Sequence, residues 1–211
     1  MKKLIHITLA CLITAAVFGS ETNQVERLIC IRHGEKPKGG LGQLSCQGLN
    51  RALALPPVLL SRFGKPDYIF APNPDQKVDD GKSYNYVRPL MTIEPTAVVA
   101  GLPVNTEYGF KDLEGLKQEI TKEKYRHAVV FIAWEHIFLD QFADKLVLAG
   151  GGNTNSVPQW PRDDFDTIFI FDITYSNSIP KVSFHTEQEN LNGLGTNYLK
   201  PYGLGSSYLR P

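Results

Sequence analysis

The sequence is poor in cysteine and has no net charge. Only three of its 211 residues are cysteine, and no Cys/His spacing resembles a zinc site. Lysine plus arginine and aspartate plus glutamate each total 22, so the formal net charge is zero. No global field therefore recruits nucleic acid or an anionic membrane. We expect no metal, no cofactor and no nucleic-acid partner, so any affinity for anions must come from a local site.

The apolar run at the N-terminus is too short to span a membrane comfortably. Two lysines precede the apolar stretch 4–18, and small residues follow it. This order is typical of a secretory signal, with a cut near Gly19 or Ser20. We therefore predict a signal peptide over 1–20, export to the periplasm or the extracellular space, and no membrane insertion after its removal. A retained anchor helix and a lipid anchor at Cys11 are the alternatives.

The remaining composition suits one globular domain, with 42% hydrophobic and 21% charged residues. Apolar runs predict strands over 27–33, 67–72 and 127–136, and helical patterns lie between them. Strands that alternate with helices predict an α/β fold, a three-layer α/β/α sandwich with a mainly parallel central sheet. Two closing strands, 166–173 and 181–186, are expected to be antiparallel neighbours.

The connecting segments have their own signals. Ser45 is expected to cap a helix over 46–64, in which Pro56 and Pro57 should introduce a kink or a break. The polar residues 73–87 read as a long loop before a second helix.

The C-terminus carries a near-repeat, "GLGTNYLKP" followed by "GLGSSYLRP". Two copies are too few for a solenoid. We therefore divide the mature chain into a domain over 21–190 and a tail over 191–211. The tail is either flexible or a docking strap anchored by Tyr198 and Tyr208.

Polar residues stand where apolar strands end or helices begin. Arg32 and His33 close the first strand, Arg88 begins a helix, and His136 closes the strand 127–136. The carboxyl ends of parallel strands share one edge of a sheet, and ligands bind there. Guanidinium groups bind phosphate oxygens, and a neutral imidazole can attack phosphorus, so this set suits a tetrahedral dianion. Gly34 lets the backbone turn sharply and approach the ligand.

Four segments together resemble the histidine phosphatase superfamily, which includes the cofactor-dependent phosphoglycerate mutases. "IRHGEKP" resembles its Arg-His-Gly motif, and "LSCQGLNRALALP" resembles its L-[ST]-x-x-G-x-x-R-A helix. "RPLMTIEPTA" is similar to the segment with its second arginine, and "VVFIAWEH" is similar to the strand before its second histidine. The order and separations also agree. A phosphoglycerate mutase-like fold is therefore implied.

The resemblance implies a role for each matching residue. His33 is the expected nucleophile, Arg32 and Arg88 clamp the phosphoryl group, and His136 completes the cradle. Gly34 and Glu135 are assigned to substrate binding. Arg51 matches a helix arginine of the family that is more often structural than catalytic.

The proton donor is the role for which the sequence departs from the family's pattern. The phytase-like branch has an aspartate directly after the second histidine, where this sequence has Ile137. In the mutase-like branch a glutamate lies several residues after a Pro-Val strand, and the resemblance implies Asp112, at that separation from Pro103, as the general acid. Glu107, Glu114 and Glu135 are its rivals.

We therefore predict an exported, metal-independent phosphomonoester hydrolase of the histidine acid type. It acts on a small phosphorylated substrate through a phosphohistidine on His33. A catalytically silent phospho-ligand binder of the same fold and a phosphotransferase, or mutase, are the alternatives. The sequence predicts neither the substrate nor the oligomeric state.

Overall fold

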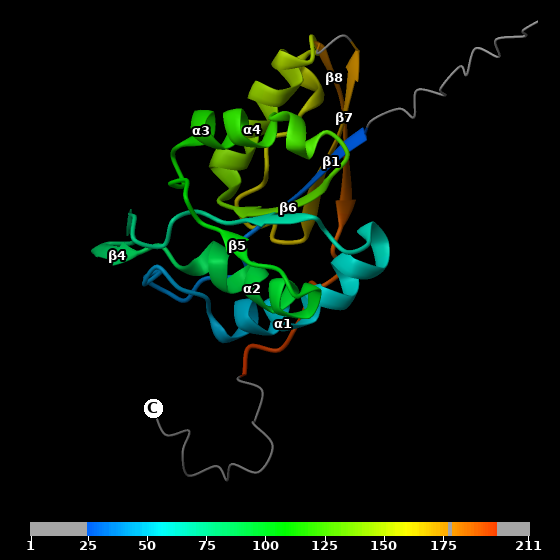
Figure 1. Ribbon diagram of the computed structural model, residues 1–211. Helices are drawn as coiled ribbons and strands as arrows, with labels where there is room; N and C mark the ends of the chain where they lie inside the picture. The colour runs from blue at the N-terminus through cyan, green and yellow to red at the C-terminus, as the bar shows by residue number, and fades with distance from the viewer. Residues whose placement is uncertain (1–24, 177–178, 198–211) are drawn as a thin grey trace, which may run out of the picture.

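A six-stranded mixed sheet forms the centre of the computed structural model, which describes residues 25–176 and 179–197 (Figure 1). The strands lie in the order β5-β2-β6-β1-β7-β8. Their bounds are Val25–Arg32 for β1, Tyr68–Phe70 for β2, Val104–Asn105 for β5, Val129–Trp134 for β6, Thr167–Ser176 for β7 and Ile179–Gln188 for β8. Neighbours from β5 to β1 pair in parallel, whereas β7 is antiparallel to both β1 and β8. The mainly parallel sheet with an antiparallel closing pair is as predicted.

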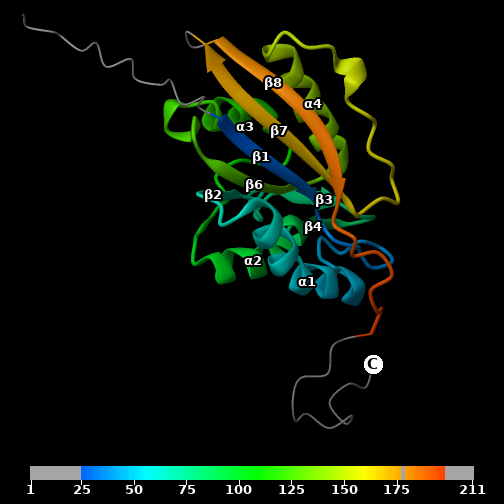
Figure 2. The same ribbon diagram turned by 90° about the vertical axis from the view of Figure 1, so that its right-hand side faces the viewer.

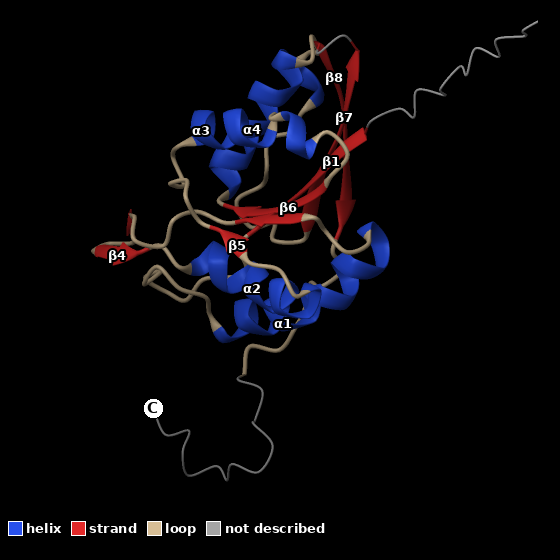
Figure 3. Cartoon of the chain, in the orientation of Figure 1, coloured by secondary structure: helices blue, strands red, loops and turns tan. Residues whose placement is uncertain are grey.

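Helices cover both faces of this sheet. Figure 3 shows them in blue above and below the red strands. One face carries α1 (Cys46–Phe63) and α2 (Arg88–Ala100), and the other carries α3 (Leu113–Ile120) and α4 (His136–Ala149). The predicted three-layer α/β/α sandwich is therefore confirmed. Within the described ranges, no helix is both long enough and apolar enough to cross a bilayer.

Burial on two sides explains why the central strands are apolar without alternation. In β1, Leu28 and Cys30 pack toward α3 and α4, while Ile29 and Ile31 pack toward α1 and α2. All four side chains are essentially inaccessible to solvent. A strand packed on both faces in this way fixes the position of the residues that follow it, here His33 and Gly34.

Helix α1 begins and ends as its sequence predicts but is not broken by its prolines. The Ser45 hydroxyl accepts a hydrogen bond from the Gly48 amide, 3.1 Å away, and Gly64 ends the helix at a φ of 77°. The expected break at Pro56 and Pro57 does not occur, because the helix continues to Phe63. Burial of Leu55, Pro56 and Leu59 against the sheet offsets the lost backbone hydrogen bonds.

The segment expected to be a polar loop contains a small hairpin. Strands β3 (Lys77–Asp79) and β4 (Ser83–Asn85) pair antiparallel across a turn in which Gly81 has a φ of 84°. The six strand residues are exposed or half-buried, so no apolar alternation marks them. The hairpin lies beside the start of α2 in sequence and in space, because its Asp80 bonds to Arg88.

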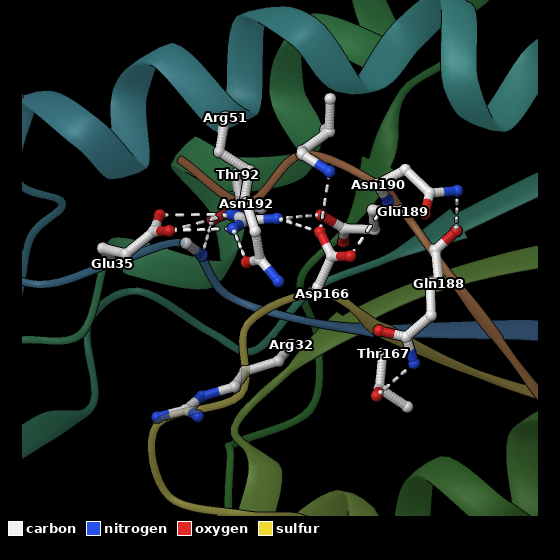
Figure 4. A network of polar contacts seen from close by, with 12 residues as sticks. Arg32, Glu35, Arg51, Thr92, Asp166, Thr167, Gln188, Glu189, Asn190 and Asn192 are labelled. Atoms are coloured by element: carbon white, nitrogen blue, oxygen red, sulfur yellow. Dashed lines mark hydrogen bonds and ion pairs between the residues drawn. The ribbon is translucent and has the colours of Figure 1, made fainter. Parts of the chain in front are cut away.

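A buried arginine on α1 joins segments far apart in the chain (Figure 4). Arg51 Nη2 lies 2.8 Å from Glu35, and its Nη1 lies 3.0 Å from Asp166 and 2.6 Å from Glu189. Its Nη2 also donates to Asn192, 3.1 Å away. The structural role predicted for Arg51 fits this cluster, which links the loop after β1 to the start of β7 and the end of β8.

Burial shifts the titration of one carboxyl group in this cluster. It raises the pKa of Glu189, although the adjacent Arg51 opposes the shift.

The chain after β8 turns back along α1 (Figure 2). Leu191 packs on the core at this face, and the Asn50 amide donates to the carbonyls of Gly195 and Asn197 at 2.7 and 3.0 Å. The first residues of the predicted tail therefore lie against the domain. The predicted signal peptide and the repeat tyrosines Tyr198 and Tyr208 lie outside the described residues.

Candidate active site

The register of two parallel strands brings the predicted histidines together. Arg32 of β1 is paired with Trp134 of β6, and the His33 amide donates to the Trp134 carbonyl at 2.9 Å. His33 therefore follows β1 at the level where Glu135 and His136 follow β6. Arg88, the first residue of α2, completes the group, since its charge and those of Arg32 and His136 all act on His33.

The His33 ring is buried and held in one tautomer. Its Nδ1 lies 2.7 Å from the Gly34 carbonyl. A carbonyl only accepts, so Nδ1 carries the proton and Nε2 keeps its lone pair. Burial lowers the pKa of His33 well below 6.5, and the charges of Arg88, Arg32 and His136 lower it further, against the Gly34 bond. A neutral ring with a free Nε2 is the form in which a histidine is a nucleophile.

Gly34 is explained by a close approach of two backbones. A Cβ on Gly34 would lie 2.9 Å from the carbonyl oxygen of Gly48 in the first turn of α1. The Gly34 amide donates to Thr92 Oγ1 at 2.9 Å, and this hydroxyl donates to the Arg88 carbonyl at 2.9 Å. The loop that carries His33 is therefore fixed against α1 and α2 at once.

Both arginines are buried, and the Nε of each is a buried N–H group without a partner in the described residues. Arg32 Nη1 donates to the carbonyls of Arg162 and Asp164 at 2.8 and 2.5 Å, and its guanidinium lies 3.9 Å from the centre of the Phe165 ring. Arg88 Nη1 donates to Asp80 at 2.7 Å. The Nε atoms of Arg32 and Arg88 have no partner in the described part of the chain. A buried, charged N–H without a partner is costly unless it binds an anion.

Glu135 fixes the start of α4 and the ring of His136. One carboxylate oxygen accepts from the amides of Ile137 and Phe138 at 2.9 and 3.3 Å. The other lies 2.6 Å from His136 Nδ1, as a charge contact that is not aligned like a hydrogen bond. Burial raises the pKa of Glu135, but His136 and the two amides outweigh it, so the pKa is lowered overall. Glu135 is therefore an ionised positioning group.

Comparison with known proteins rests on structure. No family model and no curated protein matches the sequence. The mycobacterial glucosyl-3-phosphoglycerate phosphatase matches with a TM-score of 0.54 and 14% identity, over 77% of this chain and 98% of its own. A proposed phosphohistidine phosphatase SixA from Nakamurella multipartitia matches with a TM-score of 0.53 and 9% identity, over 78% and 96%. A structure described as "Mycobacterial hydrolase 2" matches with a TM-score of 0.54 and 13% identity, over 76% of this chain and 89% of its own.

The chain has the fold of the histidine phosphatase superfamily. The predicted resemblance is thus confirmed at the level of the fold. At these identities the comparison carries no residue roles, so the site has to be argued from its own geometry.

The carboxyl groups favoured from the sequence lie on α3 or in exposed positions. Asp112 is exposed and caps α3 by accepting from the Gly115 amide at 2.9 Å. Glu114 is exposed and pairs with Lys117 at 3.0 Å, and Glu107 is exposed. The general-acid role of Asp112 stays a prediction.

A cavity of about 670 Å³ opens beside His136. Its lining is mixed in charge and consists of Lys36, Glu135, His136, Ile137, Asp140, Gln159, Trp160, Pro161 and Arg162. Asp140 lies one turn after His136 on α4 and accepts a hydrogen bond from the Trp160 amide at 3.1 Å. Burial raises its pKa, helped by Asp144 and Glu135, against Trp160 and His136. Asp140 thus keeps its proton to a higher pH than an ordinary aspartate.

Sequence reasoning missed Asp80 and Asp140. Asp80 lies on the unpredicted hairpin, where it accepts from Arg88 and from the Gly42 amide at 3.0 Å. Burial raises its pKa, but these two bonds outweigh it and the pKa is lowered. Asp140 shares a helix face with His136 at the i, i+4 spacing, and this spacing was the available signal.

The depressed pKa of His33 gives a test by titration. The ring should stay neutral from pH 8 to below 6.5, so its ring C–H resonances should not shift over that range in two-dimensional NMR spectra. Because the unfolded state binds this proton near pH 6.5 and the folded state does not, this residue makes the free energy of unfolding fall as the pH drops below about 6.5. The His33→Asn variant assigns the resonance, and a midpoint at or above 6.5 would contradict the assignment.

Proposed function

We propose that the protein is a metal-independent phosphomonoester hydrolase that forms a phosphohistidine on His33. The observation that carries the proposal is the buried, neutral His33 ring, whose proton is held on Nδ1 while the charges of Arg88 and Arg32 act on the ring and the Nε of each arginine has no partner. Planar guanidinium groups bind phosphoryl oxygens, and buried positive charge stabilises the charge that these oxygens carry in the transition state.

The reaction has two steps. His33 Nε2 attacks phosphorus in line, a P–N bond forms, and the P–O bond to the leaving group breaks as its oxygen takes up a proton. Water then attacks the phosphohistidine, the P–N bond breaks, and inorganic phosphate is released with His33 restored. Arg32, Arg88 and His136 surround the phosphoryl group in both steps.

Among the carboxyl groups that line the cavity, Asp140 is the better candidate for the proton donor. Of the two carboxyl groups that line it, Glu135 has a lowered pKa and caps α4, whereas the pKa of Asp140 is raised by burial. A general acid needs a proton at the working pH and a place beside the leaving oxygen. The raised pKa of Asp140 shifts it toward the first condition, and Asp140 lies on the cavity wall one helical turn from His136.

The cavity also bounds the substrate. Its volume of about 670 Å³ suits a small phosphorylated molecule. Both charge signs line it, so the leaving group is expected to be polar. Of the alternatives from the sequence, the silent binder becomes an outcome of the experiments below.

Replacing the nucleophile tests the activity itself. His33→Ala should lower the hydrolysis of p-nitrophenyl phosphate by about 10³-fold or more, because no other group can form the intermediate. The exposed His185→Ala is the matched control and should equal the wild type.

Equal rates in wild type and His33→Ala would contradict the proposal. A wild type that binds phosphate or vanadate without turnover would identify a silent binder instead. Chelator treatment should leave the wild-type rate unchanged.

Asp140→Asn tests the proton donor through the leaving group. Alkyl phosphates need a proton on the departing oxygen, so their kcat should fall by about 10²-fold or more. The p-nitrophenolate group leaves without a proton, so the kcat of Asp140→Asn for p-nitrophenyl phosphate should stay within a few-fold of the wild-type value. The control is Glu94→Gln, an exposed carboxyl group on α2, which should equal the wild type on both substrates. An equal loss on both substrates would contradict the role.

We further propose export, which rests on the sequence of residues 1–20 alone. N-terminal sequencing of the protein recovered from the periplasm or the medium should give a first residue near Ser20. Recovery of the full-length chain only inside the cell would contradict export.

A further inference from the structure

Tyr86 has a buried hydroxyl with no hydrogen-bond partner in the described part of the chain. Its side chain is fully inaccessible. Buried phenols almost always find a partner, because an unpaired hydroxyl in the interior is costly. A phenylalanine would fill the same space without this cost, so the hydroxyl needs another explanation.

The ring lies within the group of residues around His33. The Tyr86 and His33 rings meet edge to face with centroids 6.1 Å apart. The Arg88 guanidinium lies 4.8 Å from the centre of the Tyr86 ring. The charges of Arg88, Glu135 and Arg32 all act on the Tyr86 hydroxyl, and Arg88 approaches it without meeting hydrogen-bond geometry.

Unused donors gather at this one place. In the described residues, eight buried side-chain polar atoms lack a hydrogen-bond partner. Four of them belong to residues that contact the His33 ring or whose charges act on it, namely Arg32 Nε, Arg88 Nε, His136 Nδ1 and the Tyr86 hydroxyl. Unpaired buried donors that gather around one residue can bind the oxygens of a tetrahedral anion.

The backbone holds Tyr86 firmly in this place. Its amide donates to the Gln76 carbonyl at 2.9 Å, on the far side of the β3–β4 hairpin. The next two amides, of Val87 and Arg88, both donate to the Gly42 carbonyl at 3.0 Å. Phe110 packs edge to face on the Tyr86 ring with centroids 5.0 Å apart. A donor fixed in this way does not have to reorganise when charge develops during the reaction.

We propose that the Tyr86 hydroxyl is a third donor to the phosphoryl group, which makes Tyr86 a catalytic residue beside Arg32 and Arg88. The hydroxyl donates to a non-bridging oxygen of phosphorus while His33 attacks. It forms no covalent bond and gives up no proton. Burial raises the pKa of Tyr86, so the phenol stays protonated and can only donate to an oxyanion. This assignment rests on the proposed function for its catalytic part, but not for its binding part.

Tyr86→Phe is the test, because it removes one oxygen and keeps the ring. Orthovanadate and inorganic phosphate should bind about tenfold more weakly by titration calorimetry, as expected for one lost hydrogen bond to an anion. The kcat for p-nitrophenyl phosphate should fall about 10- to 100-fold, with a smaller change in KM. The matched control is Tyr84→Phe, two residues earlier on β4, which should equal the wild type.

A stability measurement separates this role from a structural one. Without phosphate, Tyr86→Phe should unfold at the same or a higher temperature than the wild type, since an unpaired buried hydroxyl is lost. The combination of unchanged stability and weaker anion binding supports the proposal. Unchanged vanadate affinity and unchanged kcat in a folded Tyr86→Phe would overturn it.

The outcome does not depend on the success of the hydrolase proposal. If wild type and His33→Ala are equally inactive but Tyr86→Phe weakens phosphate binding, the hydrolase proposal fails and the role of Tyr86 in binding stands. If His33→Ala abolishes hydrolysis and Tyr86→Phe matches the wild type in binding and kcat, the hydrolase proposal stands and Tyr86 has no such role.

Discussion

The parallel pairing of β1 with β6 is the constraint on which the site depends. With Arg32 opposite Trp134, the two strands end at one level, so His33 and the Glu135–His136 pair share one edge of the sheet. Helix α4 begins directly at that edge, and the bond from Gly34 to Thr92 holds the start of α2 there. A slip of one residue in this register would turn His33 to the other face and separate the group.

Burial acts on this edge in two opposite ways. The same apolar surroundings that make β1 rigid take His33 out of water and keep its ring neutral. They also take Arg32 and Arg88 out of water, where their charges persist and their Nε groups go unpaired. The domain tolerates this local cost because two apolar layers, one on each face of the sheet, supply its stability.

The sequence predicts the parts of the site that lie on long, regular elements. The apolar runs 27–33 and 127–136 end abruptly, so the histidines that follow them are recognisable. The hairpin strands have three residues each and no buried face, so Asp80 could not be placed beside Arg88. Asp112 was favoured by counting along the chain, whereas Asp140 approaches His136 through the turn of a helix.

The Arg51 cluster has a consequence for the order in which the protein is made. Glu35, two residues after His33, is held by an arginine whose partner Glu189 is 138 positions further along the chain. Synthesis runs from the N-terminus, so the first strand of the sheet exists long before Glu189 and Asn192 do. Until they arrive, Arg51 is a cation facing an apolar layer with an incomplete set of partners. The contact between Glu35 and Arg51 therefore joins two early segments, whereas the set of partners around Arg51 is completed only when the end of the domain has been made.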